Sequence, residues 1–143
     1  MRAEHILPYA KPWVMIDQIR ELDCTEGTVS MKLISSSDFF LQGHFPAYSV
    51  YPGMLLVEGI RQTINCKLQH ETDASKWKEH TIHSRFLQPV LPGDSVKYIV
   101  QRNQVDEHDA VFHGAGWVDE HKVIQVMIAY RKEGEENEAN SRH

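Results

Sequence analysis

One segment of this 143-residue chain has the pattern of a long helix, and it limits what the rest can fold into. Apolar residues recur at helical spacing from Met54 to Glu71. Pro52-Gly53 stands at the start, where proline is tolerated and backbone N–H groups have no acceptor within a helix. The first two turns hold too many apolar residues for one stripe (Met54, Leu55, Leu56, Val57, Ile60). We therefore expect the N-terminal half to be buried nearly all round, and the half toward Lys67 to be amphipathic.

Strand-like alternation fills most of the remaining chain. A hairpin is expected from Ile16 to Ile34 around Glu26-Gly27, after a proline-rich lead-in over residues 6–16. Residues 71–80 read as an exposed connection, and later strands are expected over residues 83–90, 95–105, 110–118 and 122–132. One buried helix among antiparallel strands indicates an α+β fold in which a strongly curved sheet wraps around the helix.

Composition narrows the possible functions. The length suits a single domain over residues 1–132, followed by an acidic, disordered tail over residues 133–143. A net charge of −5 without a basic stripe argues against nucleic acid as a partner. The chain has no apolar run long enough for a membrane span and no signal-peptide pattern, so we expect a cytoplasmic protein. Cys24 and Cys66 share no ligand spacing and are interpreted as free thiols.

Two titratable residues stand in opposite environments near the helix start. His44 lies in the turn Gly43-His44-Phe45-Pro46, where glycine and proline restrain the backbone and a neutral imidazole can act as a base. Glu58 lies among leucine, valine and isoleucine, which would remove water from its carboxyl and keep it protonated. The alternatives are a turn histidine bonded to the backbone, and a glutamate on the polar face that contacts Gln62 four residues later.

Gly53 supplies a third chemical group. Its N–H would point out of the helix start, where the helix dipole favours a carbonyl oxygen that gains negative charge. Ordinary helix-start chemistry is the alternative. Together, a base, an acid and a polarised carbonyl suit the removal of water from a 3-hydroxyacyl thioester.

The chain resembles a known family in three blocks: LPYAKPWVMID (residues 7–17), QGHFPAYSVYPGMLLVEGIRQ (42–62) and FLQPVLPGD (86–94). GHFP followed by VxPGxxxxE is similar to the motifs of the 3-hydroxyacyl-(acyl-carrier-protein) dehydratases of fatty-acid synthesis, the FabZ/FabA type. The resemblance covers nearly the whole chain except the acidic tail. It implies a hot-dog fold, an antiparallel sheet wrapped around one long helix.

The resemblance also implies an active site. His44 and Glu58 would be the catalytic pair, meeting across a homodimer interface, and the Gly53 amide would bind the thioester carbonyl. Val50, Gln62, Phe45 and Tyr51 are assigned with Gly53 to substrate binding. The expected partners are acyl carrier protein and a second copy of the chain, with a higher oligomer of dimers as an extension. No cofactor and no metal are expected.

Several residues depart from the family pattern. Gly59 and Arg61 replace the alanines usual beside Glu58, and Tyr48 and Tyr51 replace smaller residues. These changes leave two alternatives open: a hot-dog acyl thioesterase, in which Glu58 activates water, and a non-catalytic protein that binds acyl carrier or acyl chains. They also favour a specialised pathway, such as polyketide or polyene synthesis, over primary fatty-acid synthesis. His80-x-x-His83 resembles a metal pair but has no third ligand, and we interpret both as surface histidines.

Overall fold

The computed structural model describes residues 15–24, 27–35, 50–71, 76–104 and 107–132. These residues form strands β1 (Gln18–Cys24) and β2 (Gly27–Leu33), helix α1 (Gly53–Glu71), and strands β3 (Trp77–Phe86), β4 (Ser95–Gln104), β5 (Asp109–Val118) and β6 (His121–Lys132). The six strands make one antiparallel sheet in the order β1-β2-β4-β5-β6-β3. The α+β prediction is confirmed.

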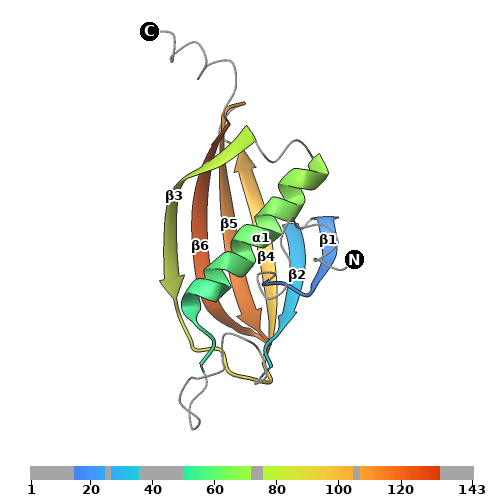
Figure 1. Ribbon diagram of the computed structural model, residues 1–143, viewed down its shortest axis with the longest axis vertical. Coiled ribbons are helices and arrows are strands. Elements are labelled where there is room, and N and C mark those ends of the chain that lie inside the picture. The colour runs from blue at the N-terminus through green and yellow to red at the C-terminus, as the bar shows by residue number, and fades with distance from the viewer. Residues whose placement is uncertain (1–14, 25–26, 36–49, 72–75, 105–106, 133–143) are drawn as a thin grey trace.

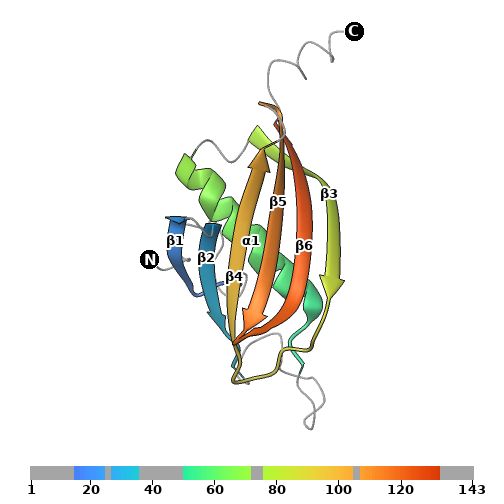
Figure 2. The same ribbon diagram turned by 180° about the vertical axis from the view of Figure 1, so that it is seen from behind.

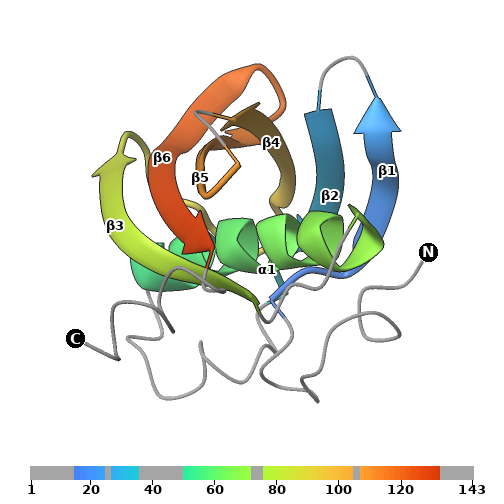
Figure 3. The same ribbon diagram turned by 90° about the horizontal axis from the view of Figure 1, so that it is seen from above.

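The sheet curves around the helix. Helix α1 crosses one face of the sheet diagonally (Figure 1), and the opposite view shows that face from behind, with the strands in front of the helix (Figure 2). Seen from above, the strands form an arc with α1 on its concave side (Figure 3). This arrangement follows from the sequence, because strands with one apolar face and a helix with a wide apolar surface bury each other.

Turn chemistry explains the two tight hairpins. Gly27 opens β2 with φ of 113°, and a side chain there would collide with the carbonyl oxygen of Val100, so only glycine fits. Asp119 joins β5 to β6 with φ of 54°, the left-handed conformation that aspartate tolerates in a two-residue hairpin. The expected β1–β2 hairpin and the strands near residues 95–105, 110–118 and 122–132 are therefore confirmed.

Strand β3 corrects one prediction. It begins at Trp77, inside the segment expected to be an exposed connection, and ends at Phe86 instead of residue 90. Most residues of this edge strand are exposed, so its sequence does not alternate between apolar and polar residues. Hydrogen bonds to β6 hold the strand in the sheet, and these bonds leave no pattern in the sequence. The strand ends where Leu87 and Gln88 both donate to the carbonyl of Val123, at 2.9 and 3.3 Å, and Pro89 has no N–H to continue.

The core lies between α1 and the middle strands. Its fully buried side chains include Tyr98 and Phe112 from the sheet and Val57, Ile60 and Ile64 from the helix. The sequence predicted that the first half of the helix would be buried nearly all round, and this is wrong, because Met54 is 63% exposed. Lys67, expected on a polar face, is only 9% exposed. The difference arises because the sheet covers one side of the helix, and a stripe from Met54 through Glu58 and Arg61 to Asn65 remains at least partly open.

Candidate active site

A backbone hydrogen bond fixes the start of α1 to the segment that follows β3. The N–H of Tyr51 donates to the carbonyl of Val90 at 2.8 Å, and the N–H of Leu55 donates to the carbonyl of Pro52 at 3.0 Å. Gly53 is the first helical residue, so its N–H has no acceptor within the helix. This geometry leaves a hydrogen-bond donor at the positive end of the helix dipole.

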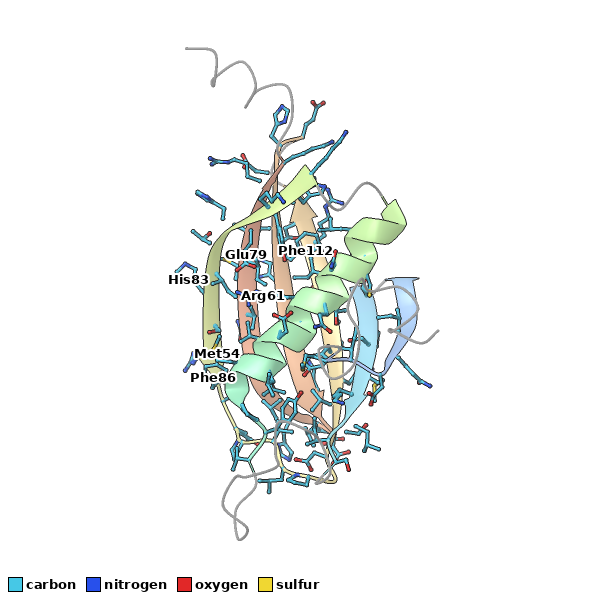
Figure 4. The ribbon with its side chains drawn as sticks, in the orientation of Figure 1. Met54, Arg61, Glu79, His83, Phe86 and Phe112 are labelled. Atoms are coloured by element: carbon cyan, nitrogen blue, oxygen red, sulfur yellow. The ribbon has the colours of Figure 1, made fainter. Side chains whose placement is uncertain are left out.

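Gly53 lies against an aromatic ring. A Cβ atom at this position would stand 2.5 Å from Cε1 of Phe86, at the end of β3. Figure 4 shows Phe86 beside Met54 at this end of the helix, and Phe86 is 52% exposed. Glycine therefore allows the ring to cover the helix start closely while the opposite side of the ring faces solvent.

Val50 and Tyr51, expected to bind substrate, lie in different surroundings. Val50 is 40% exposed and precedes the helix start, whereas Tyr51 is only 2% exposed and belongs to the core. The Tyr51 hydroxyl lies 3.7 Å from the sulfur of Met15. His44 and Phe45 lie outside the described residues.

Glu58 lies on the open stripe of α1, about one and a half turns after Gly53. Its carboxylate accepts a hydrogen bond from the side-chain amide of Gln62 at 3.3 Å and contacts the guanidinium of Arg61 at 3.4 Å. The side chain of Glu58 is 32% exposed. The structure thus places two polar donors on this carboxylate, where the sequence indicated mainly apolar neighbours.

Gln62 is held in one orientation. Its side-chain oxygen accepts the N–H of Met15 at 2.6 Å, which leaves its NH₂ group directed at Glu58. The residue is only 2% exposed, so the amide is a rigid part of the site. The i,i+4 contact considered from the sequence is therefore present, and it ties Glu58 to the segment before β1.

Arg61 connects Glu58 to β3. Its Nε and NH2 atoms each donate to one carboxylate oxygen of Glu79, both at 2.9 Å, in a two-point ion pair. Figure 4 shows both side chains between the helix and β3. The hydrogen bonds that Arg61 donates to Glu79 are the largest effect that raises the pKa of Arg61; partial burial opposes it, and the contact with Glu58 adds a smaller effect of the same sign as Glu79.

Sequence reasoning missed Glu79. It had placed the residue in an exposed connection, and a contact between positions 61 and 79 follows no helical or strand period. In the described part of the chain, no three His, Cys, Asp or Glu side chains are grouped as metal ligands would be. His83 pairs with Met127, and the strand alternation places both on the sheet face away from the helix.

Comparison with known proteins identifies the family. The model of the FabA-like domain matches residues 7–127. The chain belongs to the FabA-like family. A FabA-like relative from Methylobacterium nodulans, the 3-hydroxyacyl-(acyl-carrier-protein) dehydratase FabZ, is 37% identical over 108 residues, which are 71% of this chain and 68% of the relative. FabZ of Campylobacter jejuni is 31% identical over 135 residues, 90% of this chain and 92% of the relative.

Solved structures confirm the hot-dog fold for this FabA-like chain. A chain of the dehydratase heterocomplex ApeI:P from Xenorhabdus doucetiae superposes with a TM-score of 0.73 at 14% identity, covering 100% of this chain and 98% of that one. The PaaI protein of Escherichia coli, from the phenylacetic acid degradation operon, gives 0.66 at 15% identity over 80% and 82% of the two chains. In the part of the FabA-like chain that the structure describes, no helix has the length and hydropathy to cross a membrane.

Proposed function

We propose that this chain removes water from 3-hydroxyacyl thioesters carried on acyl carrier protein and yields the trans-2-enoyl thioesters. The pathway would be fatty-acid synthesis or a related polyketide or polyene synthesis in the cytoplasm. Its FabZ relatives, named as dehydratases of this substrate class, support the proposal. The observation that carries it is the position of Glu58, on the open stripe of α1 and about one and a half turns from the N–H of Gly53, which has no acceptor within the helix.

In this mechanism the Gly53 N–H binds the thioester carbonyl and stabilises the negative charge that develops on its oxygen. His44 removes a proton from C2, and the electrons of that C–H bond form the C2–C3 double bond. The C3–O bond breaks as Glu58 gives its proton to the departing hydroxyl, which leaves as water. Gln62, held by the backbone of Met15, orients the Glu58 carboxyl. Val50, Phe45 and Tyr51 complete the substrate site.

The active unit in this proposal is a homodimer in which each site takes His44 from one protomer and Glu58 from the other. Two features of β3 support it. In the described sheet β3 is an edge strand, with β6 on one side, so its other edge can pair with a second chain. Its helix-facing residues Ser84 and Phe86 are exposed although they pair with the buried Val126 and Ile124, so the helix does not cover this part of the sheet. In the proposal the catalytic domain spans residues 1–132, and residues 133–143 are a tail that is not part of it. A higher oligomer built from such dimers is an extension of the proposal.

The test is turnover of a panel of 3-hydroxyacyl-carrier substrates of increasing chain length, with the enoyl product measured directly. We expect Glu58→Gln and His44→Ala each to lower kcat by about 10²–10⁴-fold without changing the melting temperature. Lack of enoyl product from the wild-type protein on every chain length would refute the proposal. A concentration series checks the dimer, because a monomer that keeps full activity contradicts a shared site.

A thioesterase is the second candidate, and one contact favours it. The guanidinium of Arg61 contacts the Glu58 carboxylate at 3.4 Å, where it could hold the carboxylate in place to activate a water molecule. Release of free carrier thiol without enoyl product selects this activity. Saturable binding of the acyl carrier with neither product selects the non-catalytic alternative.

A further inference from the structure

The helix side of β3 is accessible at one end of the strand and covered at the other. The register with β6 places these residues on that side, in chain order: Trp77, Glu79, Ile82, Ser84 and Phe86. Phe86 is 52% exposed, Ser84 is exposed and Ile82 is half-buried. The side chain of Glu79 is 31% exposed, and Trp77 is only 7% exposed. A molecule bound along this side of β3 therefore has access near Phe86 and is obstructed toward Trp77.

Packed rings and cations cover the obstructed end. The guanidinium of Arg102 on β4 lies 5.5 Å from the ring centroid of Trp77 and 5.8 Å from that of Phe112. The amino group of Lys132 lies 6.0 Å from the same tryptophan ring, and Tyr130 meets Phe112 edge to face at 5.5 Å. Attraction between cations and aromatic faces holds these side chains together. The inner face beyond Glu79 is thus occupied by the chain itself.

An irregularity in β3 brings Glu79 to the helix side. The register with β6 skips one residue, His80, between Glu79 and Thr81. Strict alternation counted back from Ile82 would place Glu79 on the outer face of the sheet. The skipped residue turns it inward, as a β-bulge does, and its carboxylate then accepts two hydrogen bonds from Arg61 at 2.9 Å each. Figure 4 shows this pair between α1 and β3.

The proposed site gives the acyl chain a direction along α1. The thioester carbonyl would lie at the N–H of Gly53 and C3 at Glu58, which is further along the helix. Carbons beyond C3 that continue in this direction follow the open stripe toward Arg61 and Asn65. Arg61 stands one turn after Glu58, about 4.5 Å along the axis, which roughly four carbons of an extended chain cover. The chain therefore meets the ion pair of Arg61 and Glu79 soon after the reacting carbons.

We infer that the Arg61–Glu79 pair ends the acyl-chain site and limits this protein to 3-hydroxyacyl thioesters of about eight carbons or fewer. The inference rests on the proposed function, in which Gly53 and Glu58 hold the first carbons. The two-point pair fixes both side chains, so neither can turn aside without breaking charge-assisted hydrogen bonds. A longer apolar chain would also remove water from two charges and give them no new partner.

The experiment measures kcat/KM for enoyl formation from two carrier-bound substrates, one of about six and one of about twelve carbons, on either side of the limit. The ratio of the long-chain value to the short-chain value cancels any change in the chemistry that both substrates share, including a change at Glu58. We expect this ratio to be below about 0.1 in the wild type and to rise about 10–100-fold in Arg61→Ala. Glu79→Ala should raise it less, because the released arginine still occupies part of the space.

Arg85→Ala is the matched control. Arg85 lies on the same strand, but it is exposed and pairs with the exposed Gln125 on the outer face of the sheet. Its removal takes an arginine from β3 without changing the helix side. The ratio should stay at the wild-type value, even if kcat/KM falls for both substrates. Melting temperatures of the three variants check that each one is folded.

A second readout needs no turnover and separates this inference from the proposed function. Calorimetry measures the Kd of unreactive acyl thioether analogues of the same two lengths. The wild type should bind the longer analogue no more tightly than the shorter one, whereas Arg61→Ala should bind the longer one at least about tenfold more tightly. Equal turnover of both lengths by the wild type, an unchanged ratio in Arg61→Ala, or an equal rise in Arg85→Ala would overturn the inference and leave the dehydratase standing. The expected analogue binding without enoyl product from either length would uphold the limit and refute the dehydratase.

Discussion

The ring of Tyr98 occupies the space that a side chain at position 59 would need. A Cβ on Gly59 would stand 2.7 Å from both Cζ and Oη of Tyr98, which is fully buried on β4. Gly59 therefore serves packing. It leaves a notch in the helix surface, one residue after the proposed acid, and the ring of Tyr98 fills this notch.

Gly59→Ala tests this notch. Alanine improves helix propensity by about 1 kcal/mol, but the overlap with an immobile ring costs about 1–3 kcal/mol, so we expect a net loss of unfolding free energy. In a Tyr98→Leu background the overlap disappears, and the same Gly59→Ala change should become stabilising. Urea denaturation of the four proteins measures the coupling. The notch is disproved if Gly59→Ala has the same effect in both backgrounds.

Gly53→Ala, unlike Gly59→Ala, should mainly lower activity and should change stability little. The Cβ would meet Phe86, but this ring is 52% exposed and can swing into solvent, so the unfolding free energy should change by less than about 1 kcal/mol. The displaced ring and the shifted N–H should lower kcat/KM by about 10–100-fold.

Gly93→Ala provides the control for that prediction. Gly93 has φ of 96°, and no atom lies within 4 Å of the position that a Cβ would take, so alanine strains the backbone without a clash, at a cost of about 1–2 kcal/mol. We expect its kcat/KM to be unchanged. A Gly53→Ala protein that melts as early as Gly93→Ala, or keeps full kcat/KM, would contradict the assignment of the helix start.

Thr63 and Ser30 join the helix to β2 through a buried pair of hydroxyls. Thr63 donates to the carbonyl of Gly59 at 2.8 Å, so its single proton is used and Ser30 must be the donor in the 2.7 Å contact between the two oxygens. Thr63→Val leaves the Ser30 hydroxyl without its acceptor and should cost about 1–3 kcal/mol, more than Ser30→Ala. Thermal unfolding of both single variants and the double variant checks this order. Equal losses of unfolding free energy in the two single variants would contradict Ser30 as the donor.

Cys66 predicts a pH effect at the alkaline end. Burial raises the pKa of its thiol from 9.0 to about 12, so the folded state holds the proton longer than the unfolded state. Its contribution to stability is therefore complete below pH 9 and is lost as the pH rises from 9 toward 12, with a slope of at most about 1.4 kcal/mol per pH unit. The difference in unfolding free energy between wild type and Cys66→Ala should decline over this range. A constant difference would place the thiol in contact with water.

Most of the fold could be predicted because apolar patterns marked it. Helix α1, the first hairpin and the last three strands follow from spacing alone, and Gly53 and Glu58 share one helix, so their separation was also predictable. Strand β3 was only partly predictable. Its residues Lys78, Glu79 and His80 are exposed at the sheet edge and show no alternation of apolar and polar side chains. The contact between Arg61 and Glu79 depends on where the curved sheet brings its edge, which no local pattern encodes.

The position of β3 in the sheet also has a consequence for synthesis. Its partner in the described sheet is β6, the last strand to leave the ribosome, although β3 itself is made before β4 and β5. During translation the helix can pack on β1, β2, β4 and β5, while Glu79 and Phe86 stay unplaced until the end. A nascent chain therefore buries only part of its core before β6 adds its own core residues and provides the partner that places Glu79. Any truncation that removes β6 should leave a partly folded product in which the proposed acid has lost its support.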